Sequence, residues 1–162
     1  MSDTMAENMC SSIEILCQEP YLFALMPVSG RRLRHLVLVL VEEARRMHGE
    51  GLIPSCPEEL VLALVTDREC ASLNREAMGS FGPTNILSFP GSQGMAAELA
   101  LAPETLLRES CLYGQEPEEH LVRLLSHGLM HVCGFDHSEA MYRAQDRVMQ
   151  AGVRFLERAE NQ

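Results

Sequence analysis

The eleven residues from His127 to His137 constrain the fold of this chain more than any other stretch of its sequence. His127 and His131 are four residues apart, so on a helix both imidazoles project from the same face, one turn from each other. Gly134 can adopt a left-handed backbone conformation, which would reverse the chain and bring His137 back towards the helix. The spacing therefore predicts a helix, a turn and three converging imidazoles.

Three converging imidazoles match the protein ligands of one class of catalytic zinc site, in which water takes the fourth position. The alternative is three unrelated histidines, because a pair at this spacing also arises by chance. We interpret the pattern as one Zn²⁺ site formed by His127, His131 and His137. Among the other histidines, His120 is expected to be a solvated or helix-capping residue, and no site role is assigned to His35 or His48.

The same spacing occurs in the metzincin peptidase motif, H-E-x-x-H-x-x-G-x-x-H, with one difference. Gly128 stands where that motif has the glutamate that acts as general base. A peptidase without this glutamate would need another base, so the substitution argues against the peptidase class. We expect Gly128 to be required for its small size, because a side chain there would crowd the core or an incoming substrate.

Hydrophobic periodicity predicts alternating helices and strands. Apolar residues at helical spacing behind a Ser29 N-cap predict a helix over 29–48, and a continuous apolar run predicts a buried strand over 60–65. Asp67 is expected to cap a helix that runs to about Met78. Further strands are predicted at 13–17 (an edge strand), 85–89 and 98–102, and further helices from Pro103, over 117–134 and over 138–158. Three or four strands and about five helices indicate a compact α/β or α+β domain.

A length of 162 residues suits one domain, which we place at residues 13–160 behind a loose N-terminal tail over 1–12. No signal peptide is apparent in residues 1–20, and the apolar run Leu36–Val41 is too short to span a membrane. Six cysteines without a C-x-x-C pair indicate reduced thiols. These features predict a cytoplasmic protein with no membrane partner.

Charge limits the partners that the chain can bind. Thirteen basic residues, all arginine, and 23 acidic residues give a net charge of -10. This balance argues against a broad polyanion-binding surface, although a local cationic cleft can still bind nucleic acid.

The stretch His127-Gly128 through Gly134-Phe135-Asp136-His137 resembles the H-G-x-x-H-x-x-G-Y-D-H signature of the YbeY family, with Phe135 in place of tyrosine. The resemblance extends to Leu73-Asn74 and to the segment 83–90 (Pro-Thr-Asn-Ile-Leu-Ser-Phe-Pro), and so covers most of residues 60–145. It implies a small mixed sheet of about four strands flanked by about five helices. It also implies that His127, His131 and His137 are the zinc ligands.

The functional implication of this resemblance is a zinc-dependent, single-strand-specific endoribonuclease. The family acts in ribosomal RNA maturation, specifically small-subunit rRNA processing, and in ribosome quality control. Expected partners are therefore single-stranded or ribosomal RNA, the small ribosomal subunit and its assembly factors, and not DNA.

The sequence departs from the family pattern at two places. By register, Met78 stands where the family usually has an arginine, the natural phosphate ligand, and Ala97-Glu98 replaces a common Gly-Asp pair. Arg75, one turn before Met78, is our candidate for the missing phosphate contact, because a guanidinium binds phosphate oxygens in bidentate fashion.

Other catalytic candidates are less distinctive. Asp136 adjoins a predicted ligand and is a candidate base or hydrogen-bond acceptor, although an aspartate here can also simply form the turn. Ser88 and Thr84 can contact a phosphate or merely end a strand. Two alternatives remain open: a ribosome-assembly factor with a structural or vestigial zinc site, and a hydrolase of another substrate such as a peptide.

Overall fold

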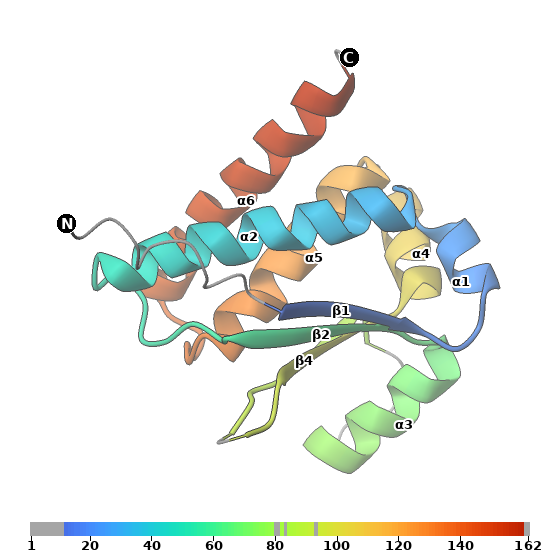
Figure 1. Ribbon diagram of the computed structural model, residues 1–162. Helices are drawn as coiled ribbons and strands as arrows, with labels where there is room; N and C mark the ends of the chain where they lie inside the picture. The colour runs from blue at the N-terminus through green and yellow to red at the C-terminus, as the bar shows by residue number, and fades with distance from the viewer. Residues whose placement is uncertain (1–11, 80–81, 83, 93, 161–162) are drawn as a thin grey trace.

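A computed structural model describes residues 12–79, 82, 84–92 and 94–160 (Figure 1). The strands are β1 (Ser12–Cys17), β2 (Glu59–Leu64), β3 (Ile86–Phe89) and β4 (Ala97–Leu101). The helices are α1 (Tyr21–Leu25), α2 (Gly30–Gly49), α3 (Asp67–Met78), α4 (Pro103–Tyr113), α5 (Pro117–Val132) and α6 (Glu139–Glu160). The predicted strands are all present, each displaced by about one residue at most. The predicted loose tail lies outside the described residues, except for Ser12, which begins β1.

The four strands form one mixed sheet in the order β1-β2-β4-β3. β1 pairs with β2 and β2 with β4 in parallel, whereas β3 runs antiparallel to β4. β1 and β3 are therefore the edge strands, as predicted for residues 13–17. The edge strand β3 also packs against α5, the helix that carries two of the predicted metal ligands.

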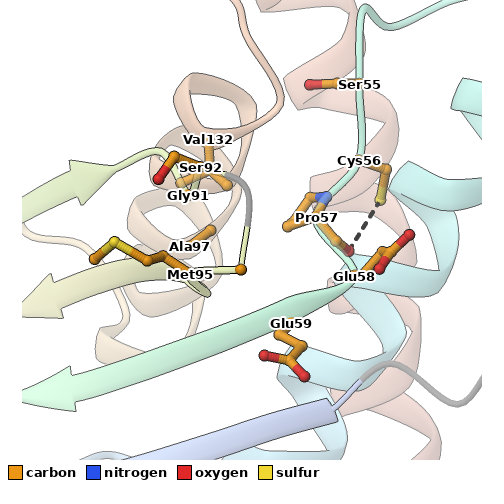
Figure 2. A pocket seen from close by; sticks show the side chains of 11 residues that line it. Ser55, Cys56, Pro57, Glu58, Glu59, Gly91, Ser92, Met95, Ala97 and Val132 are labelled. Carbon is orange, nitrogen blue, oxygen red and sulfur yellow. Dashed lines mark hydrogen bonds between the residues drawn. The ribbon is translucent and has the colours of Figure 1, made fainter.

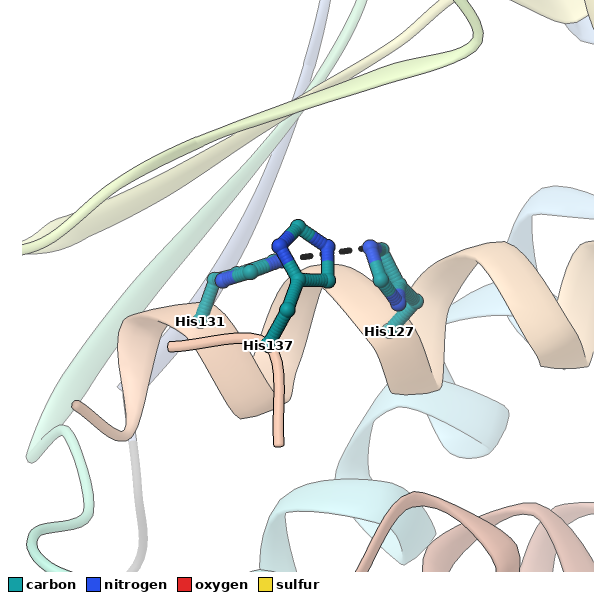
Figure 3. Close-up of side chains that lie close together, drawn as sticks. All are labelled: His127, His131 and His137. Carbon is teal, nitrogen blue, oxygen red and sulfur yellow. Dashed lines mark hydrogen bonds between the residues drawn. The ribbon is translucent and has the colours of Figure 1, made fainter. Parts of the chain in front are cut away.

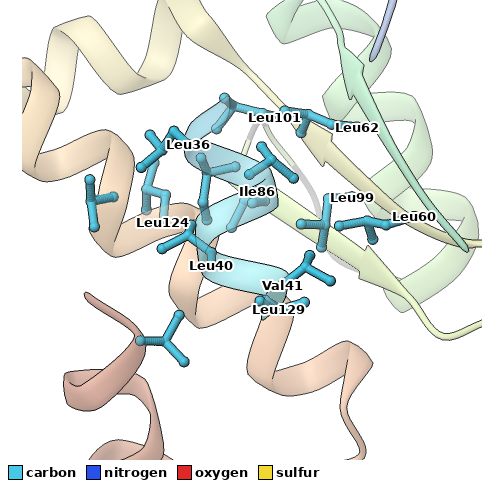
Figure 4. Close-up of a cluster of buried hydrophobic side chains, with 14 of the residues drawn as sticks. Leu36, Leu40, Val41, Leu60, Leu62, Ile86, Leu99, Leu101, Leu124 and Leu129 are labelled. Atoms are coloured by element: carbon cyan, nitrogen blue, oxygen red, sulfur yellow. The ribbon is translucent and has the colours of Figure 1, made fainter. Parts of the chain in front are cut away.

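Helices cover both faces of the sheet, with α2, α5 and α6 on one side and α3 on the other (Figure 1). Alternate strand residues point to opposite faces, so each side has its own apolar cluster. The larger cluster joins Leu60, Leu62, Ile86 and Leu99 to residues of α2 and α5 (Figure 4). The smaller cluster, beneath α3, contains Cys70, Leu87, Ala100 and Ala102. The predicted α/β class is confirmed, in a single compact domain.

The helix starts follow local capping chemistry. Ser29 caps α2 as predicted, because its Oγ accepts a hydrogen bond from the Arg32 N–H at 3.2 Å. The predicted cap of α3 is wrong. Thr66, not Asp67, is the N-cap, and Thr66 and Glu69 form a capping box in which each side chain accepts from the other's backbone N–H. Asp67 instead accepts hydrogen bonds from Thr105 and Arg108 of α4.

The short helix α1 was not predicted. Its five residues follow Pro20 and span little more than one turn, which is too short for an apolar periodicity to be visible. No helix in the described part of the chain is both long enough and apolar enough to cross a membrane.

Candidate metal centre

The backbone around the C-terminus of α5 brings the three predicted ligands together. His127 and His131 lie on α5, and Gly134 has a φ of 94°, the left-handed conformation expected of it. The Gly134 N–H donates to the His131 carbonyl and the Phe135 N–H to the Met130 carbonyl, which ends the helix and turns the chain. His137 follows this turn, just before α6 begins.

The three imidazoles converge on one point (Figure 3). One ring nitrogen from each histidine lies within 4.8 Å of the others, and the Nε2 atoms of His127 and His131 are 3.1 Å apart. Two nitrogen ligands of a tetrahedral zinc ion, at about 2.0–2.1 Å from it, are about 3.3 Å apart. His127 and His131 are half-buried, and His137 is exposed. The residues present therefore fit one metal ion with an open side.

Hydrogen bonds on the outer side of two rings orient them towards this point. His131 Nδ1 lies 3.1 Å from the Phe135 carbonyl oxygen, and His127 Nδ1 lies 3.0 Å from Gln145 Oε1. These oxygens are acceptors, so each Nδ1 carries the hydrogen and each Nε2 presents a lone pair. Metal-binding histidines commonly donate their second N–H in this way. Gln145, on α6, was missed from the sequence because nothing in its spacing links it to His127.

Burial lowers the pKa of His131, and the charges that His127 and His137 can carry lower it further. The hydrogen bond to the Phe135 carbonyl and the nearby Asp136 carboxylate act in the opposite direction. The balance favours the neutral imidazole, which is the form that binds metal.

Gly128 allows α5 to lie directly on the sheet. A Cβ at this position would come within 2.9 Å of Ile86 Cδ1 and 3.0 Å of Leu99 Cδ2. Ser88 Oγ donates a hydrogen bond to the Gly128 carbonyl at 3.0 Å, so this hydroxyl ties the helix to the strand. Position 128 thus faces the sheet, and a glutamate there would have to displace core side chains before acting as a peptidase base.

The two predicted catalytic residues differ in their relation to the histidines. Asp136 is exposed, immediately precedes His137, and makes no hydrogen bond with other described residues. Arg75 and the 70% exposed Met78 lie in the last turns of α3, across the sheet from α5 (Figure 1). The Arg75 guanidinium forms no hydrogen bond or ion pair within the described ranges. Their catalytic roles stay predictions.

The expectation that His120 is solvated is wrong. The residue is 5% exposed, because α4 packs against α5, and its Nε2 lies 2.8 Å from Glu109 Oε2. Asn85 Nδ2 also donates to both carboxylate oxygens of Glu109, at 3.2 Å. The three residues form a polar network around the buried His120, which lies two helical turns before His127. The seven-residue spacing between His120 and His127 places both on one face of the helix, and it was the sequence signal that His120 lies on the same side as the metal ligands.

Two cavities are lined in part by residues of α5. One, of about 430 Å³, is lined by His127 and Gln145 together with the Asn85–Glu109–His120 network. The other, of about 470 Å³, is lined by residues 55–59, by the loop after β3 and by Val132 (Figure 2). Only the first includes a residue of the histidine cluster, His127, together with Gln145, which bonds the Nδ1 atom of that ring.

Comparison with known proteins agrees with this geometry. The family model Endoribonuclease YbeY matches residues 28–156. The Endoribonuclease YbeY of Oleidesulfovibrio alaskensis is 40% identical over 115 residues, which cover 56% of this chain and 68% of that protein. The one from Nitratidesulfovibrio vulgaris is 35% identical over 117 residues, covering 59% and 72%.

A solved structure supports the fold. The solution structure of TM1509 from Thermotoga maritima superposes with a TM-score of 0.60 at 22% identity, covering 92% of this chain and 93% of that one. The family match over residues 28–156, which includes all three histidines, leads to one conclusion: the chain belongs to the Endoribonuclease YbeY family.

Proposed function

We propose that this chain is a zinc-dependent endoribonuclease that hydrolyses phosphodiester bonds in single-stranded RNA. The observation that carries the proposal is the convergence of three imidazoles, with ligand atoms within 4.8 Å of one another, in a chain whose relatives are named endoribonucleases. His127, His131 and His137 would hold the ion. When bound, zinc supplies positive charge that can lower the pKa of a water molecule to about 7 or polarise a phosphoryl oxygen.

The chain's own residues have separate tasks in this proposal. Gln145 and the Phe135 carbonyl hold two imidazoles in the tautomer with Nε2 free to bind metal. Asp136, exposed beside His137, accepts a proton from the attacking water. Arg75 binds a phosphate of the RNA chain through its guanidinium, which has no partner among the described residues.

The cellular role proposed for the chain follows from its family. Its substrate would be ribosomal RNA, in small-subunit maturation and ribosome quality control, and its partners the small subunit and assembly factors in the cytoplasm. A net charge of -10 is consistent with this role if a few arginines and the metal ion form a local cationic site.

The test is RNA cleavage with and without metal. Purified protein is incubated with a labelled single-stranded RNA, with chelator, and with chelator followed by excess zinc. We expect cleavage that chelator abolishes and zinc restores, and no cleavage by His131→Ala. Cleavage that survives in chelator and in His131→Ala overturns the metal role.

Two other outcomes would identify the alternatives. Binding to RNA or to the small subunit without cleavage favours an assembly factor, the role to which Met78 in place of arginine lends weight. Digestion of a peptide library favours a peptidase, which the position of Gly128 against the sheet argues against.

A further inference from the structure

The cavity of about 430 Å³ beside the metal centre has no role in the reaction described so far. His127 and Gln145 form one end of it, and Asn85, Glu109, Tyr113 and Arg123 line the remainder. Its volume is within the range of small-molecule sites. A group bound in it would lie against His127 at one end and reach α4 at the other.

Arg123 is the cation of this cavity. It lies four residues before His127, so the two side chains share a face of α5, about 6 Å apart along the helix axis. Arg123 Nη1 donates to Gln115 Oε1 at 2.8 Å, which holds the half-buried guanidinium in place. Within the part of the chain that the structure describes, no carboxylate is within ion-pair distance of it. Its charge and its remaining N–H donors are available to an anion.

The acidic residue in the cavity, Glu109, forms no ion pair with Arg123 in the part of the chain that the structure describes. Both oxygens of Glu109 accept hydrogen bonds from Asn85 Nδ2, and one of them also pairs with the buried His120. The network thus occupies the carboxylate with its own donors and gives this part of the cavity a fixed polar wall.

Tyr113 provides a flat apolar surface. It is the last residue of α4, its side chain is 65% exposed, and Gly114 ends the helix directly after it. An exposed aromatic ring beside an arginine can serve as a platform on which single-stranded nucleic acids stack a base, whatever the base.

We propose that this cavity binds one nucleotide of a single-stranded RNA next to the phosphodiester at the metal centre, with Arg123 on its phosphate and Tyr113 stacked on its base. The inference rests on the proposed function, since it names the part of the RNA that this site holds. It also gives an acidic protein a defined phosphate contact on the same helix as two metal ligands.

The experiment measures binding separately from cleavage. The zinc-loaded protein is titrated into a fluorescent single-stranded pentanucleotide with 2′-O-methyl and phosphorothioate groups, and Kd is measured by anisotropy at several salt concentrations. Arg123→Gln is expected to raise Kd about tenfold. It should also reduce the slope of log K against log salt by about 0.7, the value for one phosphate contact on a single strand.

Matched variants isolate the two contacts. Arg154→Gln makes the same charge change at an exposed arginine of α6 outside this cavity, and it should leave Kd and slope unchanged. Arg123→Lys should keep the salt slope and give an intermediate Kd, because it keeps the charge and loses the planar fork. Tyr113→Ala should raise Kd without changing the slope, whereas Tyr113→Phe, which keeps the ring, should bind as the wild type does.

Metal content and thermal unfolding verify that each variant is folded. Equal Kd and slope for Arg123→Gln and Arg154→Gln overturn the phosphate contact, and wild-type Kd for Tyr113→Ala overturns the stacking contact. If Arg123→Gln does not fold, Arg123→Lys with wild-type Kd overturns the phosphate contact instead. A wild type that cleaves RNA while these variants bind normally leaves the proposed function standing and removes the nucleotide site. If the wild type never cleaves RNA but the variants show the expected salt slopes of binding, the nucleotide site stands and the proposed nuclease function is overturned.

Discussion

His127 Nε2 and His131 Nε2 lie 3.1 Å apart, and the Nδ1 of each ring is already committed to an oxygen acceptor. Two lone pairs at this distance repel each other unless a cation lies between them. A metal ion or a proton can supply that cation, so the two compete for the same atoms. The arrangement of the two rings thus follows from a glutamine on α6 and a backbone carbonyl in the turn after α5.

Metal content tests the ligand assignment directly. The purified protein is expected to carry about one equivalent of metal, predominantly zinc, and His131→Ala should bind it far more weakly because one of three protein ligands is lost. Elemental analysis after gel filtration measures the ratio. Full metal retention by a variant with all three histidines replaced by alanine would show that the ion is held elsewhere.

Gln145 should tune metal affinity without touching the ion. Gln145→Leu removes the acceptor at His127 Nδ1 and frees the ring to rotate or change tautomer. Outer hydrogen-bond partners of this kind change metal affinity about 10- to 100-fold. Competition with a zinc chelator measures it, and Gln150→Leu, an exposed position on the same helix, is the control. Equal affinities for the two variants would mean that Gln145 does not orient the ligand.

Gly128 should be intolerant of any side chain. Gly128→Ala forces Ile86 and Leu99 to move, and overpacking of this kind typically costs about 1–3 kcal/mol in the free energy of unfolding. Gly128→Glu should be more destabilising and should not cleave casein. Urea unfolding measures the first effect, with Gly49→Ala as a control, because a Cβ at Gly49 meets nothing within 4 Å. Wild-type stability for Gly128→Ala, or casein cleavage by Gly128→Glu, would contradict this account.

Local sequence signals predicted the elements that carry the site. These signals act over one or two helical turns or within one strand, so the sequence alone reveals them. They are the Ser29 cap, the apolar run of β2, and Pro117 and Gly134 at the two ends of the helix that carries His127 and His131. The capping box of Thr66 and Glu69 is also a local signal, and it marks Thr66 rather than Asp67 as the N-cap of α3.

Contacts between residues far apart in the sequence could not be predicted from these local signals. Gln145 reaches His127 only because α6 packs on α5, and Glu109 reaches His120 only because α4 does. The strand order and the antiparallel direction of β3 also depend on how the whole chain packs. Arg123 belongs to both categories: its spacing from His127 was visible in the sequence, and the absence of a carboxylate partner among the described residues was not.

A thiol outside the metal centre should be unusually reactive. A hydrogen bond from Cys133, and the positive charges of Arg45 and His48, lower the pKa of Cys56 to about 7 although burial opposes the change. Since the thiolate is the nucleophile, alkylation of Cys56 by iodoacetamide should rise with pH through about 7. Cys56 lines the cavity in Figure 2, so the reagent can reach it.

Peptide mass spectrometry measures the rate at each pH. In urea the same cysteine should follow the ordinary thiol pKa of about 8.5, and Cys133→Ala should shift the folded profile upward because the strongest stabilising contact is lost. Identical profiles for the folded and the urea-unfolded protein would show that the environment of Cys56 does not favour its thiolate.

The arginine missing at position 78 permits a gain-of-function test. Met78 is 70% exposed in the last turn of α3, one turn after the exposed Arg75, so Met78→Arg adds a second guanidinium to the same surface. If RNA passes over this helix, Met78→Arg should steepen the salt slope of binding by about 0.7 and raise cleavage, and Arg75→Ala should do the opposite. Arg68→Ala, in the first turn of the same helix, is the control for a general loss of charge.

The Arg75 and Met78 variants, compared with those of Arg123, also decide between two routes for the RNA. α3 lies across the sheet from α5, whereas Arg123 shares a helix face with His127 (Figure 1). Effects of Arg75 and Met78 together with Arg123 would require an RNA strand that passes around the β3 edge of the sheet to contact both sides. An effect of Arg123 alone would confine the strand to the α5 side and make Arg75 an ordinary surface residue. No effect at any of the three positions, in a protein that binds zinc and the small ribosomal subunit, would favour the assembly-factor role over nuclease activity.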